Sequence, residues 1–218
     1  MESFPSQNEI VDSIFDGINT AKKNFSYWTT DELYLSDAPS NFLSIHVAQS
    51  IAKLQNSPEI FMDATIADIL SCSLSSNTPI AEFMKNNLIS QNTIDITLDK
   101  RFEHQNENDS ISKVVITLRN GVRNAKDEYK KNIETLCKIV STKVQQNSTL
   151  EYGVFAFYLD ISNKARIKAD KRIEEIKESF DTIVATHQNL KSHFKGGDII
   201  KIENIGEWCV GCYIIEPQ

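Results

Sequence analysis

Apolar residues recur at three- and four-residue spacing in several stretches of the chain, which predicts amphipathic helices. The first stretch follows Pro5, where Ser6-Gln-Asn-Glu9 has the pattern of a capping box, and continues for about four turns. Phe25, Tyr27 and Trp28 are expected to close this helix down on the body. Further helices are predicted over residues 40–54, 66–70, 79–88, 124–143 and 164–190, the last ending at a Gly196-Gly197 C-cap.

Other stretches have the pattern of strands. Thr93–Asp99 alternates around Ile94, Ile96 and Leu98, as expected for a strand with one buried face. The continuous apolar run VFAFYL, in the predicted strand Glu151–Asp160, is typical of a buried central strand. The remaining predicted strands cover residues 59–65, 113–119, 198–203 and 207–215, and the polar segment 100–112 is expected to be an exposed loop.

The order of these elements indicates one α/β domain with a helical N-terminal arm at residues 1–37. Strands 93–99 and 113–119 are expected to pair as an antiparallel hairpin, and helix 124–143 to cross over to the next strand. The domain, residues 38–218, then divides into a core at 38–160 and a C-terminal extension at 161–218 with one helix and two strands.

The charge of the chain is acidic overall but unevenly distributed. It has 23 Lys and Arg against 30 Asp and Glu, a net charge of −7, which argues against a generic nucleic-acid binder. Residues 113–147, however, have 8 basic and only 3 acidic side chains. One face of the protein could therefore still meet an anionic partner, although chance variation on solvated helices would give the same pattern.

The expected location is the cytoplasm, with no membrane association. No apolar run approaches the ~20 residues that a membrane span needs. The start MESFPSQNE lacks the basic and apolar regions of a signal peptide, and four scattered cysteines do not form a disulfide pattern.

Three segments together resemble the αβββαβ core of the PD-(D/E)XK, or restriction-endonuclease-like, nucleases. They are APSNFLSIHVA at residues 38–48, TIDITL at 93–98 and VVITLRNGV at 114–122, followed by the basic helix and YGVFAFY at 152–158. The resemblance implies a mixed sheet and a role as a component of prokaryotic defence or DNA processing. Active members of the family hydrolyse phosphodiesters with Mg²⁺, which prefers hard oxygen ligands.

The catalytic motif of that family is eroded here. Asp95 stands at the position of the metal-binding Asp, but Thr117 replaces the Glu and Arg119 replaces the Lys, while Ser40 stands where relatives often have another acid. Threonine brings no negative charge, and the Arg fork binds phosphate without releasing a proton. We therefore expect a non-catalytic protein without a cofactor that binds DNA, RNA or a partner protein.

Two alternatives remain open from the sequence. An active Mg²⁺-dependent endonuclease would need a displaced acid, for which Asp63 could join Asp95 as a ligand, or an acid from the next helix (Asp127, Glu128 or Glu134) could serve. A protein-interaction module on the nuclease scaffold, binding another protein or a second copy, is the other alternative.

The candidate nucleic-acid contacts form a local basic face. Its members are Arg119, Arg123, Lys126 and Lys130, with Lys131 beside them. On a helix, Arg123, Lys126 and Lys130 would fall within about one stripe. Such contacts would give salt-dependent, sequence-independent affinity for phosphate.

Two further motifs have simpler explanations. Cys209-Val-Gly-Cys212, with His187 and His193, has the residue types of a zinc site, but a strand would point the two thiols to opposite faces. His46 is expected to be a hydrogen-bonded core or rim histidine rather than a catalytic base.

Overall fold

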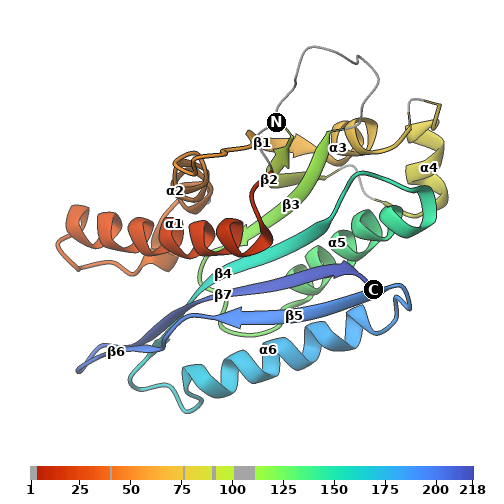
Figure 1. Cartoon of the computed structure of the whole chain (residues 1–218). Coiled ribbons are helices and arrows are strands. Elements are labelled where there is room, and N and C mark those ends of the chain that lie inside the picture. Colours follow the sequence, from red (N-terminus) through yellow and green to blue (C-terminus); the bar gives the residue numbers. More distant parts are fainter. Residues whose placement is uncertain (1–3, 40, 76, 90–91, 101–110) are drawn as a thin grey trace.

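The protein is an α/β fold with a mixed sheet between two layers of helices (Figure 1). The computed structural model describes residues 4–39, 41–75, 77–89, 92–100 and 111–218. Within these ranges there are six α-helices and seven strands. The helices are α1 (Gln7–Trp28), α2 (Phe42–Ile51), α3 (Ile66–Ser73), α4 (Ile80–Asn86), α5 (Asp127–Gln146) and α6 (Ala169–Val184), with a short 3₁₀ turn, η1, at Leu35–Asp37.

The sheet confirms the predicted hairpin and crossover. Its order is β1-β2-β3-β4-β7-β5, and β6 pairs with β7 beside this path. β1, β2 and β3 form an antiparallel meander, β4 lies parallel to β3, and α5 makes the crossover between them. The strands are β1 (Glu59–Thr65), β2 (Thr93–Asp99), β3 (Ser112–Arg119), β4 (Tyr152–Ser162), β5 (Leu190–Gly196), β6 (Ile200–Ile202) and β7 (Gly206–Pro217).

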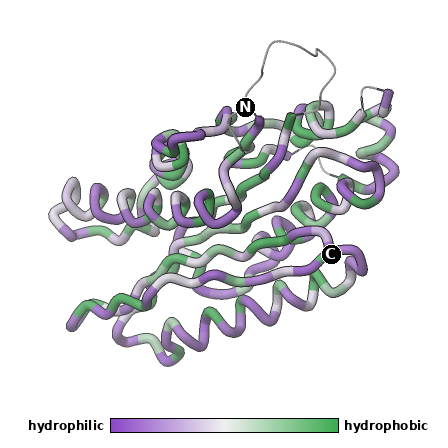
Figure 2. Tube along the Cα trace, viewed as in Figure 1, coloured by the Kyte–Doolittle hydropathy of each residue, from purple (hydrophilic) through white to green (hydrophobic). Residues whose placement is uncertain are grey.

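Two hydrophobic cores lie on opposite faces of this sheet. Alternate strand residues such as Ile116 and Val154 point to the core under α1 and α2, whereas Val115 and Phe155 point to the core under α5 and α6. Figure 2 shows the matching pattern, with hydrophobic positions along the central strands and hydrophilic positions recurring along α6. The continuous apolar run of β4 is explained by this burial on both faces.

The predicted N-terminal helix is longer in the structure. The Ser6–Glu9 capping box is present, but α1 continues to Trp28. Phe25 is buried against Phe42, and Trp28, although 64% exposed, also packs edge-on against the Phe42 ring at 5.4 Å between ring centres, whereas Tyr27 is 83% exposed.

The predicted helix over residues 164–190 is wrong at both ends. Lys164–Lys168 precede α6, and Leu190–Gly196 form strand β5, so Gly196 is no helix C-cap. β5 lies at the end of the sheet order and pairs with β7 alone, and most of its side chains are partly or fully exposed. An edge strand of this kind has a weak hydrophobic signal, which is why the sequence pattern missed it.

The expected loop at 100–112 falls mostly on residues 101–110, outside the described residues, and Ser40 lies outside them too. None of the helices in the described ranges is both long and apolar enough to cross a membrane.

Candidate functional site

The three motif positions lie together on the face of the sheet that α5 covers. Ile96 of β2 pairs with Ile116 of β3, and Asp95 and Thr117 are the residues just beyond this last pair on the two strands. Thr117 in turn pairs with Phe155 of β4, a member of the core beneath α5. Thr117 is only 3% exposed.

The Asp95 carboxylate forms an ion pair with Arg119. Its Oδ2 accepts hydrogen bonds from Arg119 Nη1 at 3.0 Å and from the Leu118 backbone N–H at 2.9 Å. Arg119 Nε donates to Asn132 Oδ1 of α5 at 3.0 Å and lies 4.0 Å from Glu128 Oε1. The guanidinium is thereby held beside the carboxylate from two directions, and its positive charge offsets the negative charge of Asp95.

The other candidate acids do not complete a metal site. Asp63 is exposed on β1, across from Asp95 in the register, with a left-handed backbone (φ 54°). Asp127, 92% exposed at its side chain, pairs with Lys130 at 3.7 Å, and Glu134 is exposed. In the described parts of the chain, no three His, Cys, Asp or Glu side chains gather as metal ligands would. The donors around Asp95, a paired carboxylate and a neutral hydroxyl, do not fit the ligand set of Mg²⁺.

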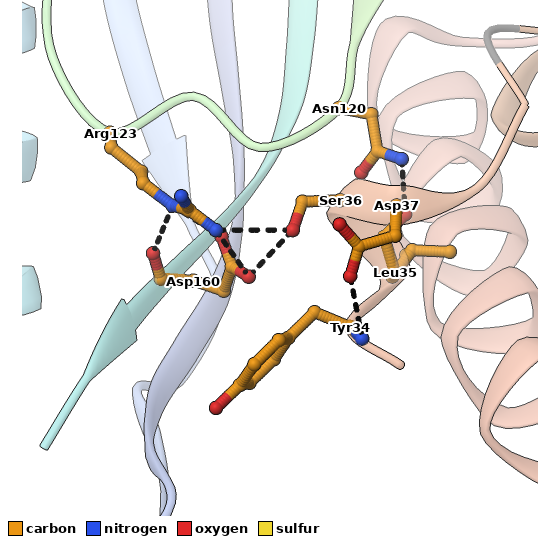
Figure 3. A network of polar contacts seen from close by, with 7 residues as sticks. All are labelled: Tyr34, Leu35, Ser36, Asp37, Asn120, Arg123 and Asp160. Atoms are coloured by element: carbon orange, nitrogen blue, oxygen red, sulfur yellow. Dashed lines mark hydrogen bonds and ion pairs between the residues drawn. The ribbon is translucent and has the colours of Figure 1, made fainter. Parts of the chain in front are cut away.

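Arg123 belongs to a polar network at the end of β4 (Figure 3). The Asp160 side chain, 5% exposed, accepts hydrogen bonds from Arg123 Nε at 2.9 Å and from Arg123 Nη2 at 3.0 Å. Ser36 Oγ of η1 donates to the same carboxylate at 2.8 Å, and Asn120 donates to the Leu35 carbonyl. The hydrogen bonds to Asp160 raise the pKa of Arg123 above its ordinary value. The network ties the loop after β3 to the end of β4 and to η1.

The two lysines of the predicted basic face also have contacts within the chain. Lys126 Nζ lies 5.8 Å from the centre of the Tyr129 ring, and Lys130 pairs with Asp127. The structure therefore brings Arg119 and Arg123 to the same end of the sheet, but both form ion pairs with buried or half-buried acids.

A second cluster of cations lies in the segment between β4 and α6 and in the first turn of α6, within the predicted helix over residues 164–190. It consists of Lys164, Arg166, Lys168, Lys171 and Arg172, which we call the α6 cationic edge. Asp170 is the only acid within residues 164–172. The segment KARIKADKR is the signal that could have found it, because it has five basic residues against one acid, and the next acid of α6 is Glu174.

The cysteine motif does not assemble a zinc site. Cys209 belongs to the core under α5 and α6, whereas Cys212 belongs to the core under α1 and α2. Burial raises the pKa of Cys209 to about 12 and that of Cys212 further. His193 lies 3.9 Å from Glu216, an acid outside the motif.

His46 is a core residue with both ring nitrogens engaged. It is 8% exposed, and its Nδ1 and Nε2 lie 2.9 Å from the Phe42 carbonyl and 3.0 Å from Asn24 Nδ2.

No protein-family model, no curated protein and no solved structure matches this chain. Its function therefore has to be inferred from the geometry of its own residues.

Proposed function

We propose that this chain binds nucleic acid on a restriction-endonuclease-like core whose cleavage site has been lost. The order α2-β1-β2-β3-α5-β4 supports the proposal, because it is an αβββαβ arrangement with α3 and α4 inserted after β1. The antiparallel meander followed by a parallel crossover supports it as well.

The observation that carries the loss of cleavage is the 3.0 Å pair between Asp95 and Arg119. A divalent ion at Asp95 would have to displace a guanidinium that Asn132 also holds, and would gain no second carboxylate from Thr117. Arginine stays protonated at every working pH, so it binds phosphate without activating a water. The resemblance suggests an accessory component of prokaryotic defence or DNA processing.

A cleavage assay separates this proposal from an active nuclease. Plasmid, linear and single-stranded DNA, and RNA, are incubated with the protein and Mg²⁺ or Mn²⁺, with EDTA as control. We expect no cleavage. Metal-dependent cleavage that Asp95→Asn abolishes would instead establish an active site in which Asp63 or an α5 acid completes the ligand set.

A binding assay tests the positive half of the proposal. Fluorescence anisotropy with labelled single-stranded and duplex oligonucleotides should show binding at about 50 mM salt that weakens strongly at about 200 mM, as phosphate contacts require. Absence of binding to DNA and to RNA at low salt would overturn it.

A protein-binding role is the second candidate, and an exposed apolar surface favours it. Tyr27, Trp28, Leu33 and Tyr34 are all at least 44% exposed, and a cavity of about 720 Å³ opens between α1 and β6–β7 beside Tyr27. Contiguous apolar surface of this kind is typical of interaction sites. The simplest partner is a second copy, and analytical ultracentrifugation of the wild type and a Tyr27→Ser/Trp28→Ser variant tests it. A dimer that this variant dissociates would support the role, and a monomer at all concentrations would exclude self-association.

A further inference from the structure

The loops that follow the two parallel strands lie at one edge of the sheet. β3 and β4 run parallel, so the segment after Arg119 and the segment after Ser162 leave from the same end. Arg123 of the first loop bonds to Asp160 near the end of β4, which fixes this loop against the strand from which the second segment leaves (Figure 3). In α/β sheets this carboxyl edge of parallel strands is where ligands commonly bind.

Two adjoining hollows open at this edge, and both are lined by arginine or lysine. The first, about 630 Å³, is bordered by Arg123, Arg166 and Arg172 together with Asp160. The second, about 560 Å³, is bordered by Arg166, Lys168, Lys171 and Lys201 together with Asp170 and Glu207. Arg166 borders both. Concave surfaces in which one sign of charge predominates concentrate ligands of the opposite sign.

The charge balance at the edge remains positive after the ion pairs are taken into account. Asp160 neutralises Arg123, Glu175 pairs with Arg172 at 2.8 Å, and Glu207 lies 3.8 Å from Lys201. Among the described residues, Lys164, Arg166 and Lys171 have no side-chain hydrogen bond or ion pair, and Lys168 donates only to the Asn163 carbonyl at 2.9 Å. These four side chains are exposed. Of the acids that line the two hollows, Asp170 alone has no ion pair within the described residues.

Some of these cations are also unfavourably placed for the stability of α6. Lys168 is the N-cap of α6 and Lys171 lies in its first turn, where the positive end of the helix dipole disfavours cations by a few tenths of a kcal/mol each. Residues that oppose local stability in this way are typical of sites with a functional role.

We propose that the α6 cationic edge binds the phosphate backbone of a nucleic acid, with Arg166 between two phosphate-binding hollows. The inference rests on the proposed nucleic-acid-binding function and moves the main contact surface from α5 to the start of α6. Arg166 supplies a planar fork that matches phosphate oxygens, and Lys168 and Lys171 act as point charges. Such contacts carry no sequence preference.

The salt dependence of binding tests the inference. Arg166→Gln/Lys171→Gln removes two exposed cations, and Lys53→Gln/Lys85→Gln, exposed on the β1 side of the fold, is the matched control. We expect the first variant to bind a labelled duplex about tenfold more weakly at about 50 mM salt, with the slope of log K against log salt reduced by about 2. The control should behave as the wild type, and circular dichroism should be unchanged in both.

A third variant distinguishes the possible failures. If Arg166→Gln/Lys171→Gln binds like the control while Lys130→Gln/Lys131→Gln weakens binding, the α5 face is the interface. The inference is then wrong, and the proposed function stands. If the wild type binds no nucleic acid, the proposed function fails with it.

Discussion

Replacing Arg123 with methionine should destabilise the protein by stranding a buried carboxylate. Asp160 is 5% exposed at its side chain and would lose the donors Nε and Nη2, keeping only the hydroxyl of Ser36. Removing one partner of a buried pair costs about 3–5 kcal/mol. Because the Arg123 side chain is itself 54% exposed, water can reach the vacated position, so we expect the lower end, about 3 kcal/mol.

Urea denaturation followed by circular dichroism measures this loss. The midpoint should fall at unchanged slope, and the melting temperature should drop by about 6–12 °C for a domain of this size. Arg172→Met is the matched control, since its partner Glu175 is 49% exposed and the pair is worth under about 1 kcal/mol. Equal losses in the two variants would show that the Asp160 network does not stabilise the fold.

Three further outcomes follow from local geometry. Gly17→Ala should cost about 2 kcal/mol despite better helix propensity, because the added methyl would lie 2.5 Å from Val47 Cα, and an unchanged urea midpoint would refute that close packing. Burial raises the pKa of Asp99, so the folded state is favoured while Asp99 is protonated, and this stabilisation is lost as the pH rises through the raised pKa. In urea titrations between acidic and neutral pH, Asp99→Asn should therefore flatten the fall in the free energy of unfolding. An unchanged pH profile of the variant would contradict this. Iodoacetamide at mildly alkaline pH should label Cys72 before Cys209, whose thiol has a pKa of about 12, and equal rates in peptide mass spectra would count against that burial.

Local patterns predicted most elements of the sheet. Strands 59–65 and 93–99 have the predicted limits, because alternation and the flanking proline or polar residues act within a few positions. The edge strand β5 escaped prediction, because its ladder to β7, not its own burial, holds it in place. The end of α6 was placed too late for the same reason.

The candidate site was predictable in its residue types but not in its contacts. Asp95 and Arg119 lie 3.0 Å apart on the two strands of the predicted hairpin, and Thr117 is two residues before Arg119 on the same strand. The basic face was expected on α5, yet Arg123 turns to an acid 37 residues away, and that acid also binds a serine 124 residues away from itself. No short-range pattern contains such pairings.

Taken by itself, the sequence determined the α/β class, the hairpin and crossover, and the identity of residues 95, 117 and 119, because periodicity and residue identity are local properties. Tertiary structure alone decided which charges are neutralised. Ion pairs join side chains that the fold brings together from distant segments. Only the three-dimensional structure could therefore distinguish Arg119 and Arg123, which are ion-paired, from the unpaired cations at the start of α6.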